Sequence, residues 1–232
     1  MPAKNSSKIY SEESFYHLYN RGVEKRDIFL DEQDYTVFLS YLKTYLLPKD
    51  EDGLHTILLS KNANIQEKDR AIKLLALNNF NNEIDLLVYS LLPNHFHLLV
   101  KQIHADGIDR FMNSLITRYV LYFNKKYHRV GPLFQGVYKA VLVESDEQLL
   151  HLSWYIHSNP LKLLGLSFTD WKKISLPFSL PEYLGQKQSE WVKTSLILEY
   201  FSKINKSDSY SNFMNKEGTL DLIKTVAIDI ND

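Results

Sequence analysis

The chain of 232 residues contains no cysteine and carries a net charge of −1 at pH 7. This length allows one folded core with an appended piece, and the missing thiols exclude disulfides and thiolate metal sites, so a metal would need His, Asn, Asp or Glu ligands. The first residues are polar rather than a signal peptide and no apolar run is long enough to span a membrane, so the sequence predicts a cytoplasmic protein.

Positive charge gathers in the middle of the chain. Between residues 101 and 140 seven basic residues stand against two acidic ones, a net charge of +5, so the rest of the chain carries −6. A basic region on a nearly neutral chain suits an anionic partner such as nucleic acid. The alternative is a solvated helix face on which the charges have clustered by chance.

The first predicted elements are a strand and a helix. Residues 16–20 alternate in polarity and are rich in aromatic side chains, which is typical of a strand, and Arg21 and Gly22 form the turn after it. Asp31 is a candidate N-cap for a helix that runs to about Leu46.

An insertion is expected next. Pro48 and the acidic residues 50–53 break the first helix. We interpret residues 53–82 as an insertion that contains a short helix near residues 66–77.

The middle of the chain predicts a β-hairpin followed by a long helix. Residues 84–91 are apolar, Pro93 and Asn94 mark a turn, and residues 95–101 read as the second strand. Residues 107–127 follow with an apolar stripe at helical spacing, which predicts an amphipathic helix.

A last strand and helix complete the predicted domain. Residues 139–144 read as a strand, and Ser145 caps a helix that runs to Ser158, where Asn159 and Pro160 stop it. The order strand, helix, strand, strand, helix, strand is the ferredoxin-like pattern of an α+β fold with an antiparallel sheet, here followed by one further helix.

The sequence therefore divides into two parts. Residues 1–165 hold the predicted ferredoxin-like domain with its insertion. Residues 166–232 form a C-terminal extension of loops with a helix near residues 191–204.

His95 and His97 flank Phe96 on a predicted strand. Side chains alternate across a strand, so both imidazoles project from one face and Phe96 from the other. Two neutral imidazoles spaced about 7 Å along a strand are able to hold one metal ion. The alternative is a pair of strand histidines with no ligand.

Tyr155 and Asn159 are four residues apart on the last predicted helix, so they share a face. A phenol becomes a nucleophile when a metal polarises the target phosphate, and an amide oxygen is a ligand that a hard cation accepts. The alternative is a buried tyrosine and a C-cap asparagine before Pro160, which is a common helix end.

Several motifs that occur in a fixed order favour the metal site and the tyrosine nucleophile over these structural alternatives. Together they resemble the REP-associated tyrosine transposases, a branch of the single-tyrosine HUH transposases of bacterial insertion sequences. The resemblance covers roughly residues 14–165 and is carried by Tyr19-Asn20-Arg21-Gly22, Leu92-Pro93-Asn94-His95-Phe96-His97-Leu98-Leu99-Val100, Thr117-Arg118-Tyr119, Gly131-Pro132-Leu133-Phe134-Gln135-Gly136 and Tyr155-Ile156-His157-Ser158-Asn159-Pro160.

The resemblance implies a site and its partners. The nucleophile falls on Tyr155, and the metal ligands on His95, His97 and Asn159. The expected ion is Mg²⁺ or Mn²⁺, because an amide is a hard ligand and no thiolate is present. Single-stranded DNA near a hairpin is the expected partner, and a homodimer the expected assembly.

Seven basic residues are predicted to contact DNA, most of them on or next to the long helix. They are Arg21, Arg110, Arg118, Lys125, Lys126, Arg129 and Lys139. This sequence also departs from the family: Val137 replaces a residue that is often basic in relatives, the insertion is longer than expected, and the segment after Trp171 fits poorly.

The predicted function is metal-dependent cleavage and rejoining of single-stranded DNA through a 5′-phosphotyrosine intermediate. Two alternatives stay open. A nucleic-acid-binding module could keep the fold without catalysis, and a metal-dependent phosphodiesterase that uses water would cut DNA without a covalent adduct.

Overall fold

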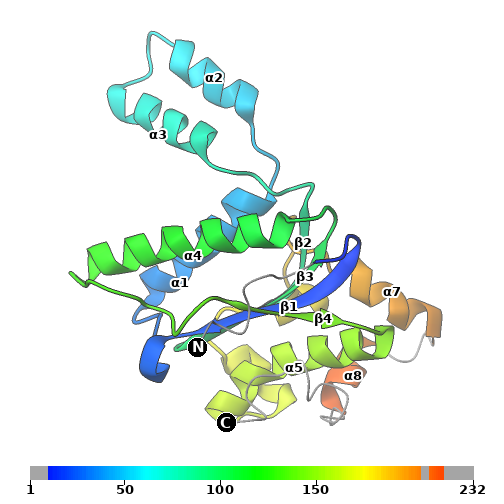
Figure 1. Ribbon diagram of the computed structural model, residues 1–232. Helices are drawn as coiled ribbons and strands as arrows, with labels where there is room; N and C mark the ends of the chain where they lie inside the picture. The colour runs from blue at the N-terminus through cyan, green and yellow to red at the C-terminus, as the bar shows by residue number, and fades with distance from the viewer. Residues whose placement is uncertain (1–9, 205–208, 217–232) are drawn as a thin grey trace.

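The computed structural model describes residues 10–204 and 209–216 (Figure 1). Four strands form one antiparallel sheet in the order β2-β3-β1-β4. With helices α1 and α4 between β1 and β2 and between β3 and β4, this is the ferredoxin-like arrangement, so the predicted fold class is confirmed. The strands are β1 (Ser14–Arg21), β2 (Ile84–Leu92), β3 (His95–Gln102) and β4 (Lys139–Val143).

Helices α1 (Glu32–Leu46) and α4 (Gly107–Lys126) cover one face of the sheet. Asp31 caps α1 as predicted, because its side chain accepts a hydrogen bond from the backbone N–H of Asp34. The first core lies between these helices and the sheet, where Phe38 of α1 meets Phe96 of β3 at a ring distance of 5.3 Å. Burying large aromatic rings of this kind supplies much of the energy that holds the layers together.

The predicted insertion is a pair of helices, α2 (Glu51–Leu59) and α3 (Ile65–Ala76), which project from the body of the molecule (Figure 1). The first helix ends before residues 50–53 as predicted, but the sequence predicts only one helix in the insertion, and α2 is the helix that it misses. Asp50 accepts a hydrogen bond from the backbone N–H of Gly53, so the acidic stretch also begins a new helix, where negative charge is favourable.

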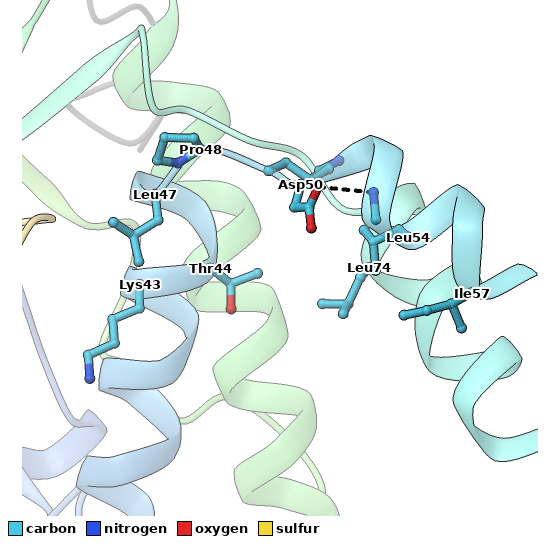
Figure 2. A pocket seen from close by; sticks show the side chains of 10 residues that line it. Lys43, Thr44, Leu47, Pro48, Asp50, Leu54, Ile57 and Leu74 are labelled. Atoms are coloured by element: carbon cyan, nitrogen blue, oxygen red, sulfur yellow. Dashed lines mark hydrogen bonds between the residues drawn. The ribbon is translucent and has the colours of Figure 1, made fainter. Parts of the chain in front are cut away.

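A groove of about 380 Å³ lies between the end of α1 and this helix pair (Figure 2). Leu47 and Pro48 line it on the α1 side, and Leu54, Ile57 and Leu74 line it on the α2–α3 side.

Helix α5 (Asp146–Leu164) covers the other face of the sheet. The prediction that it ends at Ser158 is wrong, because the helix continues through Pro160 to Leu164 and is capped by Gly165, which adopts a left-handed φ of 64°. Proline inside a helix loses one backbone hydrogen bond. Pro160 and Leu161 are both buried, and burial of their apolar side chains offsets that loss.

The C-terminal extension packs onto the α5 side and completes this second core. The predicted helix at 191–204 begins later than expected, at Ser195. Within the described residues no helix is long and apolar enough to cross a membrane. The elements of the extension are a 3₁₀ helix at Phe168–Lys173, α6 (Leu180–Tyr183), α7 (Ser195–Ile204) and α8 (Tyr210–Asn215).

Candidate active site

The two histidines of the His-Phe-His motif lie on the sheet face that α5 covers. Strand alternation sends Phe96 into the first core and leaves both imidazoles on the opposite face, as expected. The His95 and His97 rings lean together, with centroids 4.9 Å apart, which is closer than their spacing along the strand suggests. Both side chains are buried.

Tyr155 comes to the same place from α5. Its ring lies 5.7 Å from the His97 ring in an edge-to-face arrangement, and it is 2% exposed. Leu152 and Ile156 on either side of it are buried in the second core and fix α5 against the sheet. The candidate nucleophile and the two histidines therefore meet within one chain.

Asn159 lies one helical turn beyond Tyr155. Helix α5 begins just after Val143, which pairs with Phe15, and Phe15 pairs with Lys101 near the C-terminal end of β3. The helix therefore starts beside the C-terminal end of β3 and runs toward its N-terminal end. Tyr155 lies beside His97, so the next turn, which carries Asn159, continues toward His95. The Asn159 side chain is 6% exposed, and its Nδ2 has no hydrogen-bond partner among the described residues.

These residues fit a divalent ion with nitrogen and oxygen ligands. In the described part of the chain no three His, Cys, Asp or Glu side chains are grouped to hold a metal, and the amide oxygen of Asn159 is the candidate for a third protein ligand that the sequence predicts. An amide oxygen is a ligand that a hard cation accepts, and Asn159 is buried one helical turn beyond Tyr155, so it is the candidate for that role. Three protein ligands leave positions for water and a phosphate oxygen.

Sequence reasoning missed two residues next to the candidate nucleophile. His17 of β1 is buried, and its Nε2 lies 2.9 Å from Nδ1 of His97. Lys162 of α5 places its ammonium nitrogen 5.7 Å from the centre of the Tyr155 ring. His17, Tyr19 and Arg21 stand at alternate positions of β1, so strand alternation puts their side chains on one face, and this pattern was the sequence signal for His17.

His157 stands inside the same motif and has a different role. Its Nδ1 lies 2.7 Å from the hydroxyl of Tyr210 on α8, and its Nε2 lies 2.8 Å from the hydroxyl of Ser179. Complete burial lowers the pKa of His157 to about 3, so the ring is neutral. His157 thus ties α5 to the C-terminal extension.

Two of the predicted DNA-binding residues lie on the histidine face. Arg21 stands directly opposite His95 in the β1–β3 pair, and Lys139 stands opposite Tyr19 in the β1–β4 pair. Residues directly opposite each other in an antiparallel pair point to the same side. Lys139 is exposed, whereas Arg21 is buried at 9% exposure.

The other five predicted DNA contacts lie on or just after α4, across the sheet from the histidines. Several of them make internal contacts: Arg110 forms an ion pair with Glu83, and the Arg118 guanidinium lies 3.8 Å from the centre of the Tyr41 ring. Lys125 is exposed, and Arg129 is partly buried against Phe123. DNA binding by these residues stays a prediction.

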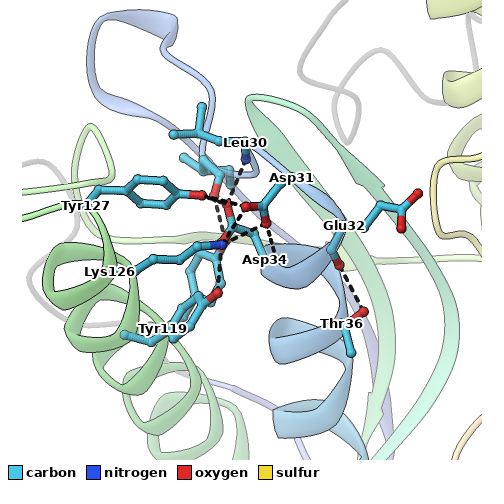
Figure 3. Close-up of polar contacts among 10 residues, drawn as sticks. Leu30, Asp31, Glu32, Asp34, Thr36, Tyr119, Lys126 and Tyr127 are labelled. Carbon is cyan, nitrogen blue, oxygen red and sulfur yellow. Dashed lines mark hydrogen bonds and ion pairs between the residues drawn. The ribbon is translucent and has the colours of Figure 1, made fainter.

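Lys126 bridges α4 to the start of α1 (Figure 3). Its Nζ lies 2.7 Å from Asp31 Oδ2 and 2.8 Å from Oδ1 of the fully buried Asp34. The hydrogen bond from Lys126 holds the pKa of the Asp31 carboxyl below its usual value. Asp34 also accepts hydrogen bonds from the hydroxyls of Tyr122 and Tyr127, so the ammonium completes a polar network.

We expect Lys126→Ala to lower the free energy of unfolding by roughly 2 kcal/mol, because it leaves the buried Asp34 carboxylate without its counter-charge. Urea unfolding at neutral pH measures the effect. Lys125→Ala is the matched control, since Lys125 is exposed on the same turn and should change stability little. Equal stability of the two variants would show that the Lys126 ion pairs contribute nothing.

Comparison with known proteins finds a family model that is similar to part of the chain. Residues 55–159 match the family model described as "Transposase IS200 like". The match runs from α2 to Asn159 and therefore includes both histidines and Tyr155. No curated protein matches the chain.

Two solved structures are similar to the chain at low identity. One is a REP-associated tyrosine transposase bound to a REP hairpin, with 9% identity and a TM-score of 0.46, covering 82% of this chain and 97% of that one. The other is a protein of Deinococcus radiodurans described as a transposase, with 19% identity and a TM-score of 0.26, covering 66% and 96%.

Proposed function

We propose that this protein, whose residues 55–159 match the IS200-like transposase family model, cuts and rejoins single-stranded DNA with Tyr155 as the nucleophile. The observation that carries the proposal is the position of the Tyr155 ring, 5.7 Å from the His97 ring on the face where His95 also lies. Tyr19, also on this face, is the tyrosine that competes for this role, with its ring 6.3 Å from that of His97.

The proposed reaction is a transesterification. The Tyr155 oxygen attacks the phosphorus in line, the bond from phosphorus to the 3′-oxygen breaks, and the 5′-phosphate stays esterified to the tyrosine. The phenol gives up a proton, and the departing 3′-oxygen takes one up. Attack by a 3′-hydroxyl reverses the sequence, so rejoining consumes no ATP.

The chain's own residues prepare this reaction. His95, His97 and Asn159 would hold Mg²⁺ or Mn²⁺, which when bound supplies polarisation of the scissile phosphate. The Lys162 ammonium lies 4.8 Å from the Trp154 ring centre and 5.7 Å from that of Tyr155, so it would add positive charge beside the proposed nucleophile. Because Tyr155 is 2% exposed, α5 must shift or the site must open before DNA reaches the phenol.

The proposed DNA surface is the rim of the histidine face, where Lys139 is exposed beside β1. The basic residues of α4 are a second candidate surface on the other side of the sheet. A hairpin-bearing single strand as the ligand and a homodimer as the assembly are parts of the same proposal.

Phosphate contacts should dominate binding, so affinity for single-stranded DNA should fall steeply with salt. We expect Lys139→Glu to weaken binding to most sequences alike and to reduce the slope of log affinity against log salt by about 0.7 for each phosphate that the variant no longer neutralises. Fluorescence anisotropy with an unstructured and a hairpin-bearing strand measures both quantities.

Lys125→Glu tests the α4 surface in the same assay, and Lys61→Glu, at an exposed position of the α2–α3 turn, serves as the control. Arg118 is a poor choice because its guanidinium packs on Tyr41. A larger loss of affinity for Lys125→Glu than for Lys139→Glu would indicate that DNA binds at α4 rather than at the rim of the histidine face. An affinity that does not change with salt concentration would contradict both surfaces.

A covalent-adduct assay tests the proposed function. Labelled hairpin-bearing single strands are incubated with the protein and Mn²⁺ and separated under denaturing conditions. We expect a protein–DNA adduct with a free 3′-hydroxyl on the released strand. Cleavage without an adduct would indicate a water-using phosphodiesterase, and binding without cleavage would indicate a binding module.

A further inference from the structure

Each histidine of the motif has a polar partner at the same ring atom, Nδ1, and each partner is a side chain outside the proposed ligand set. We propose that Asn94 and His17 are positioning residues that hold His95 and His97 with the proton on Nδ1, so that Nε2 of each ring is the atom that binds the metal. This inference rests on the proposed function and adds to it the residues that select the ligating atom.

The hydrogen bond to His95 has a defined direction. Asn94 Oδ1 lies 2.6 Å from His95 Nδ1, and Asn94 Nδ2 donates to the backbone oxygen of Lys25 at 3.2 Å. The Lys25 carbonyl only accepts, so it fixes which end of the amide carries the oxygen. An amide oxygen also only accepts, so Nδ1 of His95 must be the donor. A neutral His95 then keeps its lone pair on Nε2.

The loop around Asn94 holds this amide in place. The backbone N–H of Gly22 donates to the backbone oxygen of Asn94 at 2.9 Å, which joins the β2–β3 turn to the end of β1. A β-carbon at Gly22 would lie 2.1 Å from the backbone oxygen of Arg26, so only glycine fits this close approach. The backbone of Asn94 is therefore held by Gly22, whose own position is fixed by its close approach to Arg26.

The hydrogen bond to His97 has two possible directions with different consequences. If His17 donates from Nε2, the His97 proton must sit on Nε2, which cannot then bind a metal. If His97 donates from Nδ1, its Nε2 keeps the lone pair that a ligand needs. His97 as a ligand therefore requires His17 to accept, which places the proton of His17 on its own Nδ1.

Burial and stacking hold the His17–His97 pair together. Both side chains are fully buried, and the rings are stacked with centroids 5.1 Å apart and an interplanar angle of 19°. The hydrogen bond to His97 occupies Nε2 of His17, so His17 is a positioning residue rather than a third imidazole ligand.

Metal affinity and ring tautomers test the proposal on the full-length protein. Mn²⁺ binding is measured by calorimetry for His17→Leu, which removes the acceptor, and His17→Gln, whose amide oxygen can replace Nε2. We expect about a tenfold to hundredfold loss for His17→Leu and substantial recovery for His17→Gln. Asn94→Ala and Asn94→Asp form the same pair for His95, and His104→Leu, at an exposed position, is the control.

Long-range ¹H–¹⁵N correlation spectra of the metal-free protein report the tautomers directly. We expect both His95 and His97 to carry the proton on Nδ1, and thermal unfolding curves identify any variant that has lost its fold. Wild-type affinity in His17→Leu, or an Nε2 proton on His97, overturns the inference. Adduct formation by the wild-type protein is scored separately, so a loss of this inference alone leaves the proposed function standing.

Discussion

Tyr155→Phe should form no covalent adduct with single-stranded DNA while binding Mn²⁺ and DNA like the wild-type protein. The substitution removes one oxygen and keeps the ring, whose packing against His17 and His97 fixes this part of α5. Loss of the attacking atom removes the reaction path, so we expect the rate of adduct formation to fall by at least roughly a thousandfold. Denaturing gels of the Mn²⁺ reaction measure it.

The matched control is Tyr19→Phe, because Tyr19 is the other tyrosine whose ring lies near His97 on this face. Its adduct should form at nearly the wild-type rate. Tyr119, Tyr122 and Tyr127 lie across the sheet, where their hydroxyls donate to the Ile28 carbonyl and to Asp34. Peptide mapping of a trapped adduct that places the nucleotide on any tyrosine but Tyr155 would overturn the assignment.

The sequence was sufficient to predict the sheet and the shared face of the two histidines, but not which subunit brings Tyr155 to them. Alternation places His95 and His97 on one face, and the helix that follows the last strand can cross that face in its own subunit or in a dimer partner. His17 could not be paired with His97 in advance, because the register between β1 and β3 joins residues 80 positions apart. A single sequence contains no signal for that register.

The error at the end of α5 has a tertiary cause. Local rules predict a stop at Pro160, and these rules describe an isolated helix. Burial of α5 outweighs that local preference, whereas the missed helix α2 begins at a local cap that the Asp50 side chain provides. The basic charges of α4 show the same limit, because Lys126 binds Asp31, a partner 95 positions away.

His95→Ala and His97→Ala should each abolish metal-dependent cleavage and leave the fold intact. If His95, His97 and Asn159 hold the ion as proposed, removing one of them weakens metal binding. The ion's stabilisation of the scissile phosphate would be worth several kcal/mol, so we expect at least about a thousandfold loss of cleavage. Cleavage of a hairpin-bearing strand in Mn²⁺ measures activity, and calorimetry measures Mn²⁺ binding.

The two substitutions differ in the other contacts that they remove besides the proposed metal bond. His95 is 7% exposed and hydrogen-bonds to the neighbouring Asn94, whereas the fully buried His97 is the partner of His17 on another strand. Thermal unfolding should therefore shift more for His97→Ala, and His95→Ala is the cleaner test of the metal. His104→Ala, at an exposed position, should cleave like the wild-type protein. Full activity of the folded His95→Ala variant with Mn²⁺ present would show that His95 is not a metal ligand. Undiminished cleavage by the wild-type protein in excess chelator would show that the reaction needs no metal.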